Sequence, residues 1–351
     1  MEAAKWIAGF RSLGATVIRA AGHFNDHESD DVVVAGMWAN TAGGFPPKVD
    51  AAIVAHLCET NDVLVLDNAV TLWSAPEAAM VWERAAVESS MPTIVRHHDP
   101  PWQCLPLRPI PPGVVPVVNP RFLHVVLNQL SYVQYAERWP RLVRSRALQV
   151  SANRVDTVGL IKGDRAYTRK RLGVDGDALL VLHPARMIER KNIPAAVRIA
   201  RSLTVFGRPV HYWLTDPSDA PPGSLSEAAL RDAPGAIRGY VDDRADMYAA
   251  ADVVVLPSTW EGWGLPVIEA AAARKLIIAG PYPVLTEIRA TGLIVLDPID
   301  IPTIIEVLRS PERLDSILDN NATVVERHFN LDDLSTILTG FVDEATRLAN
   351  S

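Results

Sequence analysis

Short apolar runs alternate with longer segments of helical periodicity along most of the chain. The runs at Val253–Leu256 and Leu276–Ala279 are apolar at every position, which is typical of parallel strands buried on both faces. Further strands are predicted at Ala15–Ala21, Asp62–Leu66, Thr93–Val95, Phe122–Asn128, Leu148–Ser151, Ala178–His183, Val210–Leu214, Ala236–Val241 and Leu293–Leu296. Helical segments separate these strands, so the pattern predicts an α/β fold with parallel sheets.

The length of 351 residues suggests two domains at roughly 150 residues each. The segment Asn153–Asp164 reads as the linker between them. We therefore expect an N-terminal domain over residues 1–156, a C-terminal domain over 157–330, and a helix at 331–351 that crosses back towards the first domain.

The stretch from Val253 to Ala273 carries the strongest chemical signal. Its strand ends at Pro257, Ser258–Gly264 reads as a loop, and Pro266 suits the first position of a helix because its missing N–H is not needed there. Gly262 and Gly264 let a ligand come close to the backbone, and the free N–H groups of a helix N-terminus attract phosphate. The sequence thus predicts a phosphate site at this turn.

Two carboxylates flank the same turn, Glu261 in the loop and Glu269 in the helix. Carboxylates accept hydrogen bonds but repel phosphate, so we expect them to bind hydroxyl groups. A ligand with both phosphates and hydroxyls is a nucleotide sugar. The alternative is that both side chains are solvated, as most glutamates are.

The residues at this turn are Ser258, Glu261, Gly262, Trp263, Gly264, Leu265, Pro266, Glu269 and Ala270. In this pattern the chain resembles the family 4 retaining glycosyltransferases, whose signature is two glutamates separated by seven residues, with Trp263 standing for the usual phenylalanine. The resemblance implies the GT-B fold, in which two Rossmann-like domains face each other across a cleft. It covers residues 178–300 well and residues 60–156 loosely.

The resemblance also implies roles for particular residues. Arg186 and Lys191, five positions apart after the strand at 178–183, would bind the donor diphosphate, with Arg190 as a competing neighbour. Glu261 would contact the transferred sugar and Glu269 the ribose, with Gly262, Trp263, Gly264 and Leu265 forming the donor loop. Tyr240 lies where the family contacts the nucleobase, although it could instead pack.

A histidine after the strand at 93–95 is the remaining candidate. The chain has His97 and His98 there, and the family pattern of histidine followed by Asp favours His98. A hydrogen-bonded structural histidine is the alternative.

Two features depart from the family. Met1 falls where the first helix should begin, so we expect the N-terminal domain to lack its first strand and the Gly-rich loop after it; the Gly43–Gly44 pair comes too late to replace that loop. A start site assigned too late is the favoured explanation, and a sheet rearranged to do without the strand is the alternative. The family commonly has Gly where this chain has Arg274 or Lys275.

Composition narrows the function further. The net charge of −7 argues against general nucleic-acid binding, and no apolar run reaches the roughly 18 residues of a membrane span. Two cysteines form neither a disulfide framework nor a zinc set, so a cytoplasmic protein is expected. A basic cluster at Arg138, Arg141, Arg144 and Arg146 suits an anionic acceptor or a membrane surface, but a solvated face is the favoured interpretation.

The sequence therefore predicts a retaining glycosyltransferase that moves a sugar from a nucleoside-diphosphate sugar to an acceptor hydroxyl, without a cofactor or an essential metal ion. Two rivals stay open: a GT-B sugar-nucleotide epimerase or a phosphorylase, and a nucleotide-sugar-binding protein with little or no catalysis. An NAD dehydrogenase is disfavoured because no Gly-x-Gly-x-x-Gly follows an early strand.

Overall fold

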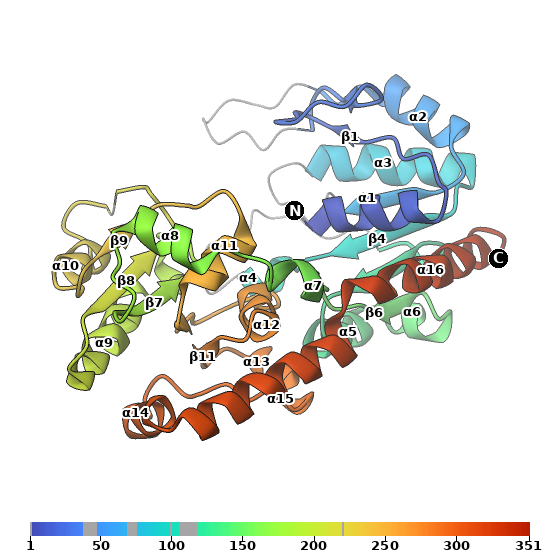
Figure 1. The fold of residues 1–351 in the computed structure, drawn as a ribbon. Coiled ribbons are helices and arrows are strands. Elements are labelled where there is room, and N and C mark those ends of the chain that lie inside the picture. Colours follow the sequence, from blue (N-terminus) through green and yellow to red (C-terminus); the bar gives the residue numbers. More distant parts are fainter. Residues whose placement is uncertain (1, 38–47, 69–75, 99, 105–117, 220) are drawn as a thin grey trace. The chain divides into compact units, whose positions relative to one another are not determined.

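The chain divides into two compact units, which we describe separately. The computed structural model describes residues 2–37, 48–68, 76–98, 100–104, 118–219 and 221–351 (Figure 1). Unit 1 comprises Met1–Ala152 and Asp332–Ser351, and unit 2 comprises Asn153–Leu331, whereas the sequence placed the first boundary after residue 156. The Gly43–Gly44 pair and most of the Pro-rich segment 105–120 fall outside the described residues.

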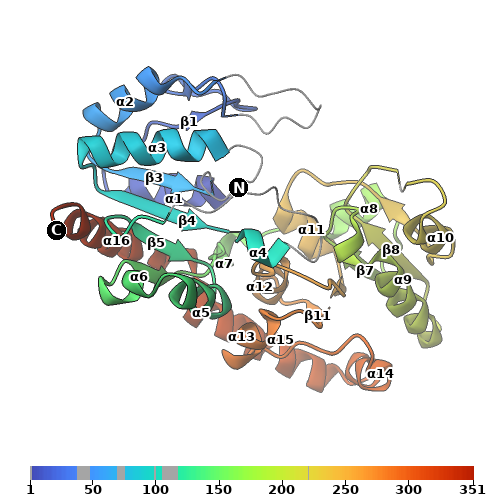
Figure 2. The same cartoon turned by 180° about the vertical axis from the view of Figure 1, so that it is seen from behind.

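Unit 1 is built on a four-stranded parallel sheet in the order β3-β4-β5-β6, of which Figure 2 labels the first three strands. Its strands are β3 (Leu64–Asp67), β4 (Thr93–His97), β5 (Leu123–Val126) and β6 (Leu148–Val150). Its helices are α1 (Glu2–Ser12), α2 (Ala51–Thr60), α3 (Pro76–Ser89), α4 (Pro101–Cys104), α5 (Gln129–Arg138), α6 (Pro140–Arg144) and α16 (Leu334–Ala349). Every residue of β4 and β5 is buried, which agrees with strands covered on both faces.

The start of unit 1 differs from the prediction. The strand expected over Ala15–Ala21 is reduced to β1 (Ala20–Ala21), which pairs in parallel with β2 (Val32–Val33), a strand that the sequence did not predict. Arg19 and Asp31 flank this pairing, with Arg19 Nε 2.6 Å from Asp31 Oδ1. The pairing of β1 with β2 therefore involves two residues of each strand and the adjacent ion pair. Strands of two residues are too short to show an alternating pattern in the sequence.

The first helix, α1, and the last helix, α16, pack against each other inside unit 1. Trp6 of α1 lies against Phe341 of α16, with ring centroids 5.8 Å apart. The two helices approach closely because residue 9 is glycine; a Cβ there would lie 2.7 Å from Leu338 Cδ1. Helix α16 also packs on β4 and β5.

Unit 2 contains a five-stranded parallel sheet in the order β11-β10-β7-β8-β9, and Figure 1 labels all of these strands except β10. The strands are β7 (Leu179–His183), β8 (Val210–Leu214), β9 (Ile237–Arg238), β10 (Val253–Leu256) and β11 (Leu276–Ala279). Strand β7, the first along the chain, lies in the centre with β8 on one side and β10 on the other. The chain order reverses between β7 and β10, and ligands of doubly wound sheets bind outside the carboxyl ends at such a point.

Helices of unit 2 connect these strands. They are α7 (Thr157–Leu160), α8 (Arg165–Leu172), α9 (Ile193–Ser202), α10 (Leu225–Arg231), α11 (Arg244–Ala250), α12 (Leu265–Ala272), α13 (Leu285–Ala290), α14 (Ile301–Arg309) and α15 (Pro311–Phe329), with 3-10 turns at Glu189–Lys191, Leu203–Phe206 and Leu331–Asp333. None of the helices in the described parts of the chain is long and apolar enough to cross a membrane.

Two predictions for unit 2 need correction. The expected strand over Leu293–Leu296 is a single bridge between Ile278 and Leu296. The segment Asn153–Asp164, expected to be a linker, contains the helix α7. Asp156 stabilises the start of this helix by accepting a hydrogen bond from the Gly159 N–H at 2.7 Å. Arg274, where the family commonly has Gly, takes the left-handed conformation itself with φ +56°.

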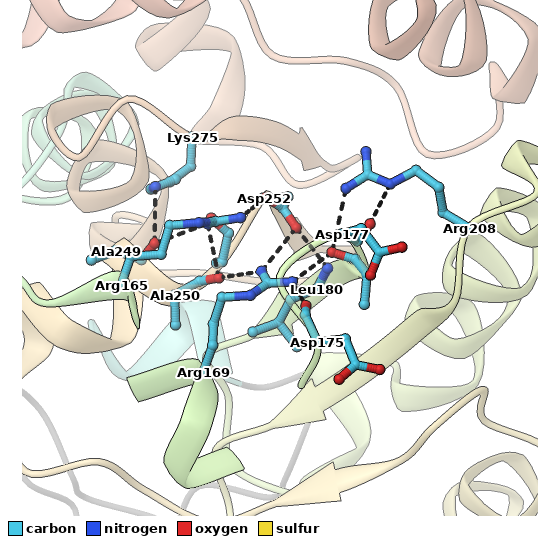
Figure 3. Close-up of polar contacts among 12 residues, drawn as sticks. Arg165, Arg169, Asp175, Asp177, Leu180, Arg208, Ala249, Ala250, Asp252 and Lys275 are labelled. Carbon is cyan, nitrogen blue, oxygen red and sulfur yellow. Dashed lines mark hydrogen bonds and ion pairs between the residues drawn. The ribbon is translucent and has the colours of Figure 1, made fainter. Parts of the chain in front are cut away.

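A partly buried polar network joins α8 to the N-terminal ends of β7 and β10, which are the ends away from the expected ligand site (Figure 3). The Asp252 carboxylate accepts hydrogen bonds from Arg165 Nη2 at 2.6 Å, Arg169 Nη1 at 3.3 Å and the Leu180 N–H at 2.8 Å. Arg169, only 3% exposed, also donates to the carbonyl oxygens of Ala250, Asp175 and Ala178. The network joins α8, the start of β7 and the turn before β10.

Candidate donor-binding site

Two loops of unit 2 meet at the point where the strand order reverses. One follows β7 and ends in the 3-10 turn Glu189–Lys191, and the other joins β10 to α12. Because β7 and β10 are parallel neighbours, these loops leave the sheet at the same edge. The Thr259 N–H donates to the Arg190 carbonyl oxygen at 2.9 Å, which holds the two loops together.

Glu261 is the centre of the contact between the loops. Lys191 Nζ lies 2.5 Å from Glu261 Oε1, and Arg190 Nη1 lies 3.1 Å from Glu261 Oε2. Glu261 is 7% exposed, so its charge is balanced by these cations rather than by water. The structure thus gives Glu261 two protein partners, where the sequence predicted only a hydroxyl-bearing ligand.

Lys191 is itself buried, at 8% exposure. Burial lowers the pKa of its ammonium group, while the charge and hydrogen bond of Glu261 act in the opposite direction. A cation this poorly hydrated interacts strongly with any anion that reaches it.

Arg186, the other predicted diphosphate ligand, lies on the exposed part of the same loop. Among the residues that the structure describes, no hydrogen bond or ion pair involves its guanidinium group. Its charge is close enough to lower the pKa of Lys191. Arg186 and Lys191 therefore lie on one loop, one exposed and one buried.

The donor loop reaches α12 through Gly264, the residue before the first helical position. Helix α12 begins at Leu265, so Pro266 occupies its second position rather than the first that the sequence suggested. Gly264 has φ +95°, and a Cβ there would lie 2.3 Å from the Tyr282 hydroxyl oxygen. Both the backbone conformation and the lack of space require glycine at this position.

Trp263 and the remaining loop residues occupy different environments. The Trp263 ring is 7% exposed and meets Phe329 edge-on, with centroids 5.7 Å apart, so this side chain packs inside unit 2. Gly262 and Leu265 are partly exposed at the turn. Tyr240 is 61% exposed, which leaves its ring available to a ligand and removes the alternative that it packs.

Glu269 lies on the first turns of α12 and faces α11. It forms an ion pair with Arg244 and accepts a hydrogen bond from the Tyr248 hydroxyl at 2.8 Å. The side chain is 5% exposed. Its predicted role towards ribose stays a prediction, now with two protein partners that share the carboxylate.

Sequence reasoning missed the partners Arg244 and Tyr248, and it also missed Tyr282. The only signal for the first two is their spacing of four residues, which places them on one face of α11. Tyr282 is 3% exposed, and burial raises the pKa of its hydroxyl, with Glu261 adding to the effect. Nothing in the sequence pattern places this residue against Gly264.

His98 belongs to unit 1, at the end of β4. Its Nε2 lies 2.7 Å from Asp67 Oδ1, and its backbone N–H donates to Asn68 Oδ1 at 3.1 Å. His97 is fully buried and its Nε2 lies 3.0 Å from His124 Nδ1. Burial lowers the pKa of His97 well below its ordinary value, so His97 is a neutral core residue and not a ligand contact.

No group of three or more potential metal ligands occurs among the described residues. The chain contains one Asp-x-Asp sequence, Asp175–Gly176–Asp177. It precedes β7 and therefore lies at the N-terminal end of the strand, away from the donor loop.

Comparison with known proteins agrees with this geometry. A family model described as "Glycosyl transferases group 1" matches residues 180–309, which include both loops and α12. The match shows similarity to this family over less than half of the chain. Within the matched residues lie Arg186, Lys191, Tyr240, Glu261 and Glu269.

Among curated proteins, the chain is similar to an alpha-D-kanosaminyltransferase of Streptomyces kanamyceticus. The two are 24% identical over 242 residues, which is 63% of this chain and 62% of that protein. The chain therefore spans less than two thirds of this relative.

Solved structures resemble the chain over almost its whole length. The Anabaena protein HepE, in complex with UDP and glucose, has a TM-score of 0.70 and 15% identity over 97% of this chain and 95% of its own. A glycosyltransferase from Rickettsia africae ESF-5 has a TM-score of 0.72 and 14% identity over 98% and 94%. The chain thus has the GT-B fold, with two Rossmann-like domains.

Proposed function

We propose that the protein is a glycosyltransferase that transfers a sugar from a nucleoside-diphosphate sugar to a hydroxyl group of an acceptor. The observation that carries the proposal is the Glu261–Lys191–Arg190 cluster at the reversal point of the unit 2 sheet. It combines a carboxylate for sugar hydroxyls, Glu261, with a buried cation for a diphosphate, Lys191. The similarity to HepE, whose structure contains UDP, supports a nucleoside-diphosphate donor.

In this proposal each part of the site has one task. Arg186 and Lys191 stabilise the negative charge that grows on the leaving diphosphate, since fixed cations in a water-poor site act most strongly on developing charge. Glu261 holds the transferred sugar and Glu269 the ribose. Tyr240 stacks on the nucleobase, and the backbone of Gly262, Gly264 and Leu265 approaches the phosphates at the α12 N-terminus.

We further propose retention of configuration, as in the family 4 enzymes. Both buried carboxylates of the site are held by cations, Glu261 by Lys191 and Arg190 and Glu269 by Arg244, so neither is poised as a covalent nucleophile. The acceptor then attacks from the face of the leaving group, and the departing phosphate takes its proton. In this proposal His98 contacts the sugar or the acceptor, and the reaction uses no divalent cation.

A ligand screen followed by product analysis tests this function. UDP-, GDP- and ADP-sugars are added in a thermal-shift assay, and the cognate donor is expected to raise Tm because at 100 times Kd it stabilises the native state by about 2.7 kcal/mol. That donor is then incubated with sugar acceptors in excess EDTA, and transfer to an acceptor hydroxyl is expected. Conversion of the donor alone to an isomeric nucleotide sugar would identify an epimerase instead, and binding without turnover would identify a binding protein.

The two glutamates are expected to affect different parts of the donor. Glu269→Gln should weaken both the free nucleoside diphosphate and the nucleotide sugar, since each lost charged hydrogen bond costs about 1.5–3 kcal/mol. Glu261→Gln should weaken the nucleotide sugar without weakening the free nucleotide, because the free nucleotide has no transferred sugar. Calorimetric titration measures both affinities.

Tyr248→Phe is the control for Glu269. It removes one protein contact of that carboxylate and leaves the charge in place. If Glu269 serves only to hold α11 against α12, both substitutions will lower Tm while nucleotide affinity stays unchanged, and the ribose role is then wrong.

A further inference from the structure

Arg190 is hydrogen-bonded to the donor loop through both its side chain and its backbone. Its Nη1 donates to the Trp260 carbonyl oxygen at 2.9 Å and to Glu261 Oε2 at 3.1 Å. Its own carbonyl oxygen accepts from the Thr259 N–H at 2.9 Å. One residue therefore joins the loop after β7 to three successive residues of the loop after β10.

The two oxygens of Glu261 are divided between the cations. Oε1 accepts from Lys191 and Oε2 from Arg190, so each cation has an oxygen of its own. The Lys191 ammonium has two further N–H donors for a phosphate, but its charge is shared with Glu261. Without Arg190, Lys191 alone would have to balance a carboxylate that is 7% exposed. A buried carboxylate without a cation is strongly unfavourable.

We infer that Arg190 is a positioning residue that neutralises Glu261 and holds it in place, so that the charge of Lys191 is available to the donor diphosphate. The inference rests on the proposed donor site and divides the three neighbouring cations between two tasks. Arg186 and Lys191 bind phosphate, whereas Arg190 acts through Glu261. The guanidinium of Arg190 is turned to Trp260 and Glu261, and its side chain is 24% exposed.

A double-mutant cycle separates this role from direct phosphate contact. The variants are Arg190→Gln, Glu261→Gln and the combination of both, and the probe is inorganic pyrophosphate, which contains the diphosphate without base or sugar. Arg190→Gln alone should raise the Kd for pyrophosphate about tenfold or more, since Lys191 would be the sole cation left to Glu261. In the Glu261→Gln background the same substitution should have little effect, because no carboxylate competes for Lys191.

Controls exclude general effects of charge and folding. Arg198→Gln removes the same charge from an exposed position on α9 and should leave the Kd unchanged. Arg190→Lys retains a cation that can reach Glu261, and it should recover most of the affinity.

The outcomes are distinct. An equal loss of affinity from Arg190→Gln in both backgrounds would show direct phosphate contact or a purely structural role, and either would overturn the inference. Unchanged affinity in Arg190→Gln would overturn it as well, while leaving the donor site intact. A wild-type protein that binds neither pyrophosphate nor UDP, GDP or ADP would overturn the proposed function and this inference with it.

Discussion

Lys191→Met is expected to lower kcat by about 100- to 1,000-fold, the range seen when one charge-stabilising group is removed from an active site. Methionine keeps the apolar stem in a position that is 8% exposed, so the loss should come from the missing charge. The affinity for nucleoside diphosphate should fall much less, because the charge on the leaving group is largest in the transition state. Comparison of kcat with the Kd for nucleotide measures this split.

Lys170→Met is the matched control. Lys170 is an exposed lysine of α8, at the opposite end of the unit 2 sheet from the donor loop, and its loss should leave kcat unchanged. Wild-type turnover together with wild-type nucleotide affinity in Lys191→Met would remove Lys191 from the site. A loss of nucleotide affinity with kcat unchanged would show that Lys191 serves in ground-state binding alone.

Asp252→Ala is expected to lower the free energy of unfolding by about 1–3 kcal/mol, the cost of leaving a buried donor without its acceptor, because the Asp252 side chain is itself 21% exposed. The carboxylate serves Arg165, Arg169 and the Leu180 N–H together. Arg169 is 3% exposed and cannot exchange the carboxylate for water. Denaturant unfolding monitored by circular dichroism provides the measurement.

Asp319→Ala provides the comparison within the same unit. Asp319 pairs with Arg274, but both side chains are well exposed, so its removal should change the unfolding midpoint little. If Asp252→Ala behaves like Asp319→Ala, the network of Figure 3 is too well hydrated to hold α8 in place.

The strands of unit 2 were largely predictable because burial on both faces leaves an unbroken apolar run. Val253–Leu256 and Leu276–Ala279 are strands with the predicted bounds. Prediction failed where the formation of a strand depends on its pairing with a partner far away in the sequence, or where the strand is very short. Leu293–Leu296 is apolar enough for a strand, yet it forms one bridge to Ile278, and β2 is too short to show any period.

The sequence named candidate residues for the site, whose roles stay predictions, but it could not predict their contacts. A turn with two glycines and two glutamates can be recognised in the sequence, and the chemistry of these residues predicts a ligand with phosphates and hydroxyls. The pairing of Glu269 with Arg244 and Tyr248 depends on which face α11 turns towards α12, and packing rather than local pattern decides that. The same holds for Arg190, whose role depends on the parallel pairing of β7 with β10.

The contact between α1 and α16 has a consequence for the order of events during synthesis. Trp6 and Phe341 belong to one unit, although all of unit 2 lies between them in the sequence. A ribosome that adds about 5–20 residues per second releases the N-terminal segment first. The apolar face of α1 therefore stays uncovered until α16 has been synthesised. Unit 2, by contrast, is one continuous segment and has all its residues before α16 is made. The half of the protein that is made first is therefore the half that is completed last.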